Sequence, residues 1–220
     1  AEDIDVNTIA RIMDGRSCAE LETVVNTAGL FAGYARSECI TMEHLLEACL
    51  RNVFDAPPTT NDSDDMISHA NLTNPNNEGT QIVYHEAGHA VAMYSLPTHD
   101  PVHQISIIPR GNALGLTWTQ PKEDSNHLTR NEMYERIVGL LGGRVAEALF
   151  LNDISTGASN DIDRASKLAR DMVARYGMCE ELGTVSYLGG GEVFIGRDYQ
   201  TTKSYSEKVA GTIDDQVKLL

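Results

Sequence analysis

Apolar side chains recur every three or four residues over most of the chain, the spacing of helices that bury one face. Three such stretches begin directly after Asp5, Ser17 and Thr41, which carry side chains that cap a helix N-terminus. Glu20 lies three residues after Ser17 and completes a capping box. The sequence therefore predicts a module of three packed helices over residues 1–54. The expected inward-facing side chains of the second helix are Leu21, Val24, Val25, Ala28 and Phe31.

The pattern changes between residues 55 and 80, where Pro, Asn, Asp and Ser replace the apolar positions. Such a composition cannot bury enough apolar surface to fold by itself. We predict a linker that is partly disordered, with His69 in contact with solvent.

Two extended patterns, at residues 102–108 and 113–119, flank a turn-forming tetrapeptide at residues 109–112 and predict a β-hairpin. Many peptidases bind substrate by adding its backbone to a free strand edge. An ordinary structural hairpin explains the pattern equally well. The candidate substrate-binding edge comprises Leu114, Gly115, Leu116, Thr117 and Trp118.

Helical spacing returns after the hairpin. Thr129 and Glu132 form a second capping box, and three glycines inside the helix that follows suggest that another helix crosses it closely. Two more helices are predicted, one after the loop at residues 155–161 and one over residues 206–220. The fold class is mainly α with a small β-hairpin or sheet. The apolar side of the helix after Thr129 is expected to comprise Met133, Ile137, Leu140, Leu141, Val145, Ala148 and Leu149.

A net charge of −15 argues against a nucleic-acid-binding surface. There is no apolar run near 18 residues and no signal peptide, so the polypeptide is expected to be soluble as given. Four cysteines without a Cys-x-x-Cys pair indicate buried thiols in a reducing compartment.

The chemistry centres on His85-Glu86-Ala87-Gly88-His89. Residues four apart share one face of a helix, so both imidazoles can bind one metal ion, for which zinc is expected. Glu86 then lies beside the metal, where its carboxylate can take a proton from an activated water molecule. The alternative is that the short motif occurs by chance and that these are ordinary helical histidines.

A third ligand must come from elsewhere, because the third histidine of the longer metzincin motif would fall at Ser95. Two carboxylates compete. Glu147 lies on a downstream helix and could instead pair with Arg144, whereas Asp161 lies in the first turn of the next helix and could be only a capping acid. The residues alone leave both open.

Five stretches of the chain resemble the FtsH family of membrane-anchored, ATP-dependent zinc proteases. Three resemble its peptidase domain, and two resemble the helical lid of its AAA+ ATPase domain. In chain order, the peptidase stretches are residues 85–90, 142–147 and 156–162, and the lid stretches are residues 14–21 and 40–43.

The resemblance implies His85, His89 and Asp161 as ligands of one zinc ion per chain, with Glu86 as general base. Glu147 becomes a supporting or structural acid. The resemblance also implies a helical AAA+ lid at residues 1–54, the linker at 55–80 and a zincin-like, mostly helical peptidase domain at 81–220.

The resemblance further implies a hexameric ring that cuts unfolded membrane or soluble proteins. Without a phosphate-binding loop or a membrane span, the chain is expected to be a fragment that begins at the lid and is truncated at its C-terminal end. ATP, magnesium, ATPase activity and membrane contact would belong to the full-length protein. That protein is expected in a bacterial inner membrane or an organelle membrane, with this part on the cytoplasmic or equivalent side.

Two other functions remain open. A non-catalytic oligomerisation or adaptor module could hold a structural zinc, although such sites usually have four protein ligands and only three good ones are present. An ATP-independent zinc endopeptidase is the second alternative, and the lid-like N-terminus argues against it.

Overall fold

The computed structural model describes residues 4–54, 74, 77–110, 113–121, 127–187 and 205–220. The predicted linker, with His69, lies almost wholly outside these residues. The chain forms two compact units, whose boundary falls within one helix. One comprises Ala1–Ala87 and Asp100–Asp124, and the other Gly88–His99 and Ser125–Leu220.

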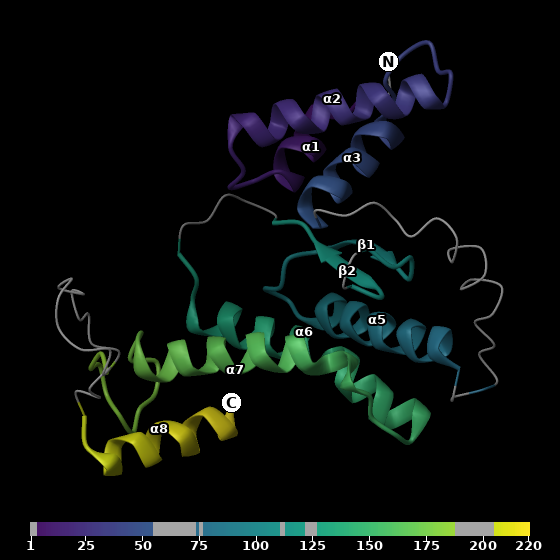
Figure 1. Ribbon diagram of the computed structural model, residues 1–220. Helices are drawn as coiled ribbons and strands as arrows, with labels where there is room; N and C mark the ends of the chain where they lie inside the picture. Colours follow the sequence, from purple (N-terminus) through teal and green to yellow (C-terminus); the bar gives the residue numbers. More distant parts are fainter. Residues whose placement is uncertain (1–3, 55–73, 75–76, 111–112, 122–126, 188–204) are drawn as a thin grey trace, which may run out of the picture. The chain divides into compact units, whose positions relative to one another are not determined.

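Three helices open the first unit and confirm the prediction for this region (Figure 1): α1 (Val6–Ile12), α2 (Cys18–Tyr34) and α3 (Met42–Phe54). The Asp5 side chain caps α1, and Ser17 with Glu20 forms the capping box of α2. The helices pack around a cluster of buried side chains. Its members are Ile12, Met13, Val24, Ala28, Leu45, Ala48 and Cys49.

The stripe predicted for α2 is correct except at its margin. Val24 is buried, whereas Val25 is 53% exposed. Consecutive residues are about 100° apart around a helix, and the core lies on the Val24 side of α2.

The predicted hairpin is present, with shorter strands than the pattern suggested. Strands β1 (Val102–Ser106) and β2 (Leu116–Thr119) pair antiparallel, and a bridge joins Arg110 to Ala113 before the turn. The buried Arg110 guanidinium donates two hydrogen bonds to the Glu47 carboxylate on α3, at 2.9 and 2.7 Å. A bidentate pair of this kind fixes orientation as well as charge, so it ties the hairpin to α3.

Helix α5 (Glu78–Ser95) carries the His-Glu motif and ends before Pro97. The helix starts at Glu78, so residues 78–80, which were predicted to belong to the linker, are helical. Ile82 and Ala90 are buried, whereas Val91 is 66% exposed.

Helix α6 (Arg130–Ala146) has the predicted capping box of Thr129 and Glu132. The apolar side predicted for this helix is wrong at its C-terminal end, because Val145, Ala148 and Leu149 are exposed. The α-helix stops at Ala146 and continues as a wider π-turn, η1 (Glu147–Leu151), which rotates Ala148 and Leu149 away from the earlier stripe.

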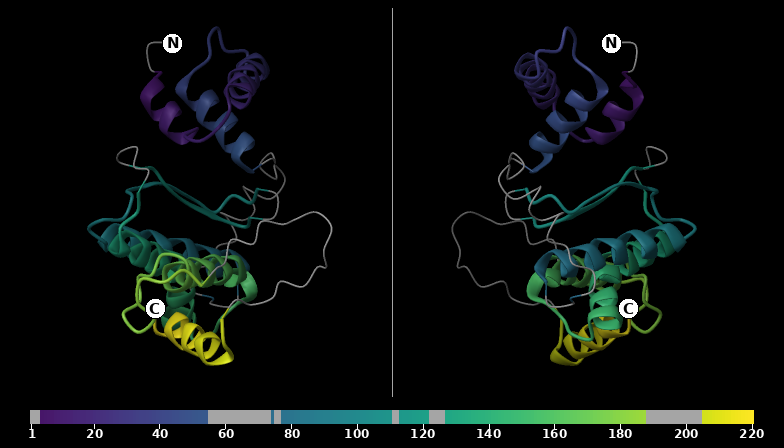
Figure 2. Two further views of the ribbon diagram at one scale, coloured as in Figure 1. Left: turned by 90° about the vertical axis from the view of Figure 1, so that its left-hand side faces the viewer. Right: turned by 90° about the vertical axis from the view of Figure 1, so that its right-hand side faces the viewer.

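A short 3₁₀ turn, η2 (Thr156–Ala158), leads into α7 (Ser159–Ala174), and α8 (Glu207–Leu219) lies beside α7 (Figure 2). Ile213 of α8 is buried against Val173 and Ala174. Gly177, three residues after the end of α7, has a φ of 61°, a backbone conformation that glycine adopts without strain. The cluster between α6 and α7 comprises Met133, Ile137, Ala165, Ala169 and Met172.

The fold is mainly α with a small antiparallel sheet, in agreement with the predicted fold class. Among the described residues, no helix has both the length and the apolar character that crossing a membrane requires.

Candidate metal centre

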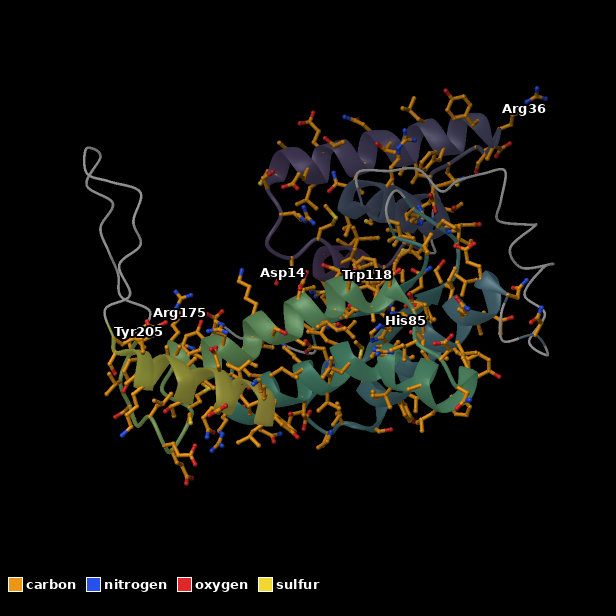
Figure 3. The ribbon with its side chains drawn as sticks, turned by 60° about the horizontal axis from the view of Figure 1, so that its bottom comes forward. Asp14, Arg36, His85, Trp118, Arg175 and Tyr205 are labelled. Atoms are coloured by element: carbon orange, nitrogen blue, oxygen red, sulfur yellow. The ribbon has the colours of Figure 1, made fainter. Side chains whose placement is uncertain are left out.

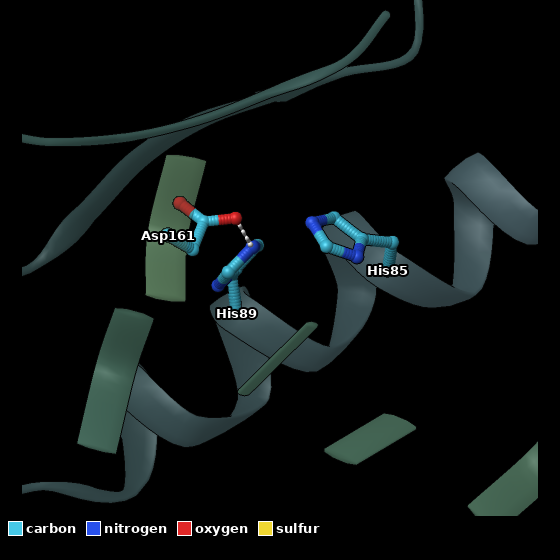
Figure 4. Close-up of side chains that lie close together, drawn as sticks. All are labelled: His85, His89 and Asp161. Carbon is cyan, nitrogen blue, oxygen red and sulfur yellow. Dashed lines mark ion pairs between the residues drawn. The ribbon is translucent and has the colours of Figure 1, made fainter. Parts of the chain in front are cut away.

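One helix supplies the two histidines. His85 and His89 are one turn apart on α5, so their imidazoles leave the helix on the same side. With Asp161 they form a group whose ligand atoms all lie within 4.8 Å of one another. Figure 4 shows the three side chains converging, with two ring nitrogens and a carboxylate oxygen turned toward a common point.

The His89 ring is held by a main-chain carbonyl. Its Nδ1 lies 2.8 Å from the carbonyl oxygen of Gly139, which can only accept a hydrogen bond, so Nδ1 carries the proton. The Gly143 amide nitrogen, 3.4 Å from the same Nδ1, therefore makes no hydrogen bond to it. The lone pair of Nε2 is left for a metal, the usual orientation of a histidine ligand.

Asp161 lies in the first turn of α7, where the helix dipole and free amides favour an ionised carboxylate. Its Oδ2 is 3.4 Å from His89 Nε2, and its side chain is 17% exposed. Donor atoms at this distance leave room for one ion to replace the direct contact.

Glu147, the competing carboxylate, is not part of this group within the described residues. It is 1% exposed and opens the π-turn after α6. Its two oxygens accept hydrogen bonds from the Ser155 amide at 2.8 Å and from the Ser155 hydroxyl at 3.0 Å. Ser155 in turn caps η2 by accepting from Gly157 N, so Glu147 anchors the loop that leads to Asp161.

Glu86 points its carboxylate at the hairpin. It is 7% exposed, and the Thr117 hydroxyl lies 2.7 Å from its Oε2 and 3.0 Å from its main-chain oxygen. A Cβ atom on Gly115 would lie 2.5 Å from Oε1 of Glu86. Thr117 and Gly115 belong to the predicted strand edge, but the sequence pattern did not indicate their contact with Glu86. The alternation of side chains along a strand, which puts residues two apart on one face, is the only local signal for it.

Glycines allow α5 and α6 to cross closely, as the three glycines inside the helix after Thr129 predicted. A Cβ atom on Gly88 would lie 2.5 Å from both the Ala146 Cβ and the Gly142 carbonyl oxygen. The crossing brings the Gly139 carbonyl to His89, so helix packing and ring orientation depend on each other.

The predicted substrate edge is partly altered by the structure. Strand β2 begins at Leu116, so Leu114 and Gly115 precede it, and Leu114 is 47% exposed. Within the described residues β2 pairs only with β1, which leaves its other edge without a strand partner. The Trp118 side chain, labelled in Figure 3, instead packs against the cluster of α1, α2 and α3. Its ring is edge-on to that of His103.

The donor set fits a metal ion. Two imidazoles and one carboxylate are a common ligand set of catalytic zinc, which keeps a further position open. The buried Nδ1 contact to a carbonyl supplies the outer support that such ligands need. His99 and His103 lie outside the group in the described part of the chain.

Comparison with known families agrees with this geometry. The model of Peptidase family M41 matches residues 73–220, about two thirds of the chain. The chain belongs to peptidase family M41. A second model, the AAA+ lid domain, matches residues 3–47, ahead of the M41 region.

Three curated relatives are named ATP-dependent zinc metalloprotease FtsH, with numbers in two of the names. FtsH 1 of Thermoanaerobacter sp. (strain X514) is 44% identical over 219 residues, covering 99% of this chain and 34% of the relative. FtsH 2 of Alkaliphilus metalliredigens is 43% identical over 218 residues, covering 99% and 30%. FtsH of Caldicellulosiruptor bescii is 43% identical over 218 residues, covering 99% and 34%. This M41 chain thus spans about a third of the length of these relatives.

Proposed function

We propose that this chain is the zinc endopeptidase part of an FtsH-type ATP-dependent protease and hydrolyses peptide bonds of unfolded polypeptides. The observation that carries the proposal is the convergence of His85, His89 and Asp161, with Glu86 next to the first ligand. Family membership and the names of the relatives support the same activity.

In this proposal His85, His89 and Asp161 hold one zinc ion. When bound, zinc supplies Lewis acidity, which lowers the pKa of water and polarises a carbonyl group. Three protein ligands are typical of a catalytic site, whereas a structural zinc usually has four. Glu147 has a supporting role, because its buried carboxylate holds the Ser155 loop ahead of Asp161.

Glu86 is the proposed general base. Its carboxylate accepts a proton from the attacking water and then gives it to the leaving amine nitrogen, so one group serves both halves of the hydrolysis. The substrate would add its extended backbone to the free edge of β2 and the residues before it, from Leu114 to Trp118. Main-chain pairing of this kind demands little of the substrate sequence.

The domain organisation follows the same proposal: an AAA+ lid at residues 1–54, a linker at 55–80 and the peptidase domain at 81–220. The two family matches, at residues 3–47 and 73–220, support it. The full-length protein would hydrolyse ATP with magnesium, assemble as a hexamer and be anchored in a membrane by regions outside this sequence. Its partners would be polypeptide substrates and copies of itself.

The deciding experiment measures zinc content and cleavage of unfolded casein for four proteins: the unmodified chain, Glu86→Gln, Asp161→Asn and Asp163→Asn. Glu86→Gln should keep one zinc per chain and lose about 10²- to 10⁴-fold in cleavage rate, the usual contribution of a general base. Asp161→Asn should lose both zinc and cleavage. Asp163→Asn makes the same chemical change two residues later on α7, at an exposed position, and should keep both.

Other results would point elsewhere. Full activity in Glu86→Gln would remove the assigned base. Zinc retained by Asp161→Asn but lost by Glu147→Gln would transfer the ligand role to Glu147. Zinc without cleavage, even within the full-length hexamer, would favour an adaptor with a structural metal. Cleavage by the full-length protein without nucleotide would favour an ATP-independent peptidase.

A further inference from the structure

We infer that Thr117 and Gly115 position the Glu86 carboxylate for its role as base, an inference that rests on the proposed function. Both residues belong to the hairpin, and neither is among the proposed metal ligands. Thr117 lies in β2 and Gly115 directly precedes the strand, and both approach the Glu86 side chain.

Thr117 supplies a directed hydrogen bond. Its hydroxyl lies 2.7 Å from Glu86 Oε2 and 3.0 Å from the Glu86 main-chain oxygen. A hydroxyl has one proton, and the closer, charged acceptor forms the stronger bond. The proton therefore goes to the carboxylate, which fixes the orientation of its two oxygens.

Gly115 supplies space. A Cβ atom at this position would lie 2.5 Å from Oε1, 2.7 Å from Cγ and 2.9 Å from Cδ of Glu86. All three atoms belong to the end of one flexible side chain. A methyl group at residue 115 would therefore displace the carboxylate, whereas the strand and the helix could stay in place.

The contacts of Thr117 and Gly115 restrict the conformation of the Glu86 side chain, which the motif by itself does not. Glu86 follows His85 on a helix, and a glutamate there has several rotamers that keep the helix unchanged. A general base must stay within hydrogen-bond reach of the proton that it takes. The hairpin selects one rotamer through Thr117 and leaves room for it at Gly115.

The test compares Thr117→Val, which keeps the shape but removes the hydroxyl, with Thr117→Ser, which keeps the hydroxyl. Thr23→Val is the matched control, since it makes the same change at an exposed position of α2, outside the proposed site. Measurements on the zinc-loaded full chain are kcat, KM, zinc content and affinity for a peptide hydroxamate by calorimetry. Crystal structures of the variants locate the Glu86 carboxylate.

Thr117→Val should lower kcat about 10- to 100-fold, the scale of a misplaced reacting group, with KM and zinc content unchanged. The hydroxamate, whose acidic group meets the base, should bind about tenfold more weakly, and the Glu86 side chain should leave its position. Thr117→Ser should restore most of kcat, and Thr23→Val should match the unmodified chain. Gly115→Ala should lower kcat and move the carboxylate while keeping zinc.

The inference is overturned if Thr117→Val keeps kcat and hydroxamate affinity, or if Thr117→Ser loses as much kcat as Thr117→Val. It is also overturned if Gly115→Ala leaves kcat and Glu86 in place. Glu86→Gln separates this result from the parent proposal. Cleavage lost in Glu86→Gln but kept in Thr117→Val rejects the positioning role alone, whereas cleavage kept in Glu86→Gln rejects the proposed function.

Discussion

Gly88 and Gly142 each occupy a position where a Cβ atom would lie within 3 Å of the opposite helix. For Gly88 the obstructing atoms are the Ala146 Cβ and the Gly142 carbonyl oxygen, both at 2.5 Å. Neither belongs to a flexible side-chain end, so a substitution must move a helix. Gly88 also lies next to His89, so that movement reaches this proposed ligand.

Gly88→Ala is expected to reduce the free energy of unfolding by roughly 1 to 3 kcal/mol, the usual cost of overpacking a tight contact. Zinc affinity should fall as well, because the His89 ring depends on the same helix crossing. Urea unfolding and zinc titration measure the two effects. Gly211→Ala is the control: nothing lies within 4 Å of its Cβ position in α8, so alanine there should stabilise by roughly 0.5 to 1 kcal/mol. Equal stability of the two variants would contradict the packing argument.

At the scale of elements, Glu135 joins α6 to the turn that follows α5. The side chain is 4% exposed, and its oxygens accept hydrogen bonds from the Thr98 amide and the Asn131 side chain, both at 2.9 Å. Burial by itself would raise the pKa of Glu135, but the hydrogen bonds from Thr98, Asn131 and the His99 backbone outweigh it, so the pKa lies below its ordinary value of 4.5.

A lowered folded-state pKa sets the sign of the pH dependence. The stabilisation from Glu135 is complete above the ordinary value of 4.5 and is lost as the pH falls from there through the lower folded-state pKa. Glu135→Gln should cost roughly 1 to 3 kcal/mol at pH 7, because charge-assisted hydrogen bonds are replaced by weaker ones. The stability difference from the unmodified chain should shrink below about pH 4.5.

Urea unfolding at several pH values between 7 and 3 measures that difference. Glu181→Gln serves as the control, because its exposed side chain stays in contact with water in the folded chain. A stability difference between Glu135→Gln and the unmodified chain that stays constant over this range would show that the carboxylate charge does not contribute.

At the scale of the whole molecule, the proposed metal links folding to binding. An ion that binds only the folded chain stabilises it by about 2.7 kcal/mol at a hundredfold excess over Kd. The ligands come from two segments, α5 and the start of α7, that are distant in sequence and come together only in the folded chain.

Removing zinc with a chelator should therefore lower the thermal midpoint of the chain by roughly 5 to 10 °C, given about 2 to 4 °C per kcal/mol for a chain of this size. Asp161→Asn, which lacks a ligand, should melt at the same temperature with and without chelator. Differential scanning calorimetry measures both. A similar chelator shift in Asp161→Asn would place the stabilising metal elsewhere.

Much of the helical architecture could be predicted because its determinants are local. The boxes of Ser17 with Glu20 and of Thr129 with Glu132 connect residues three apart, and both form as expected. The errors lie at the margins of apolar stripes. Val25 was wrongly predicted to face inward because the packing of α2, which the spacing does not show, decides which residues are buried. Leu149 was wrongly predicted because the π-turn after Ala146 is not visible in the spacing.

By itself the sequence determined that the two histidines of the proposed metal site share one face of a helix, because they are four residues apart. It also contains the motifs that indicate the family. It could not choose between Glu147 and Asp161 on physical grounds, since both are carboxylates on helices downstream of His89. The tertiary structure brings Asp161 to His89 and turns Glu147 toward Ser155. It also brings Thr117 to Glu86, 31 residues away in sequence. Such contacts depend on how helices and strands pack over long chain separations, which local spacing does not encode.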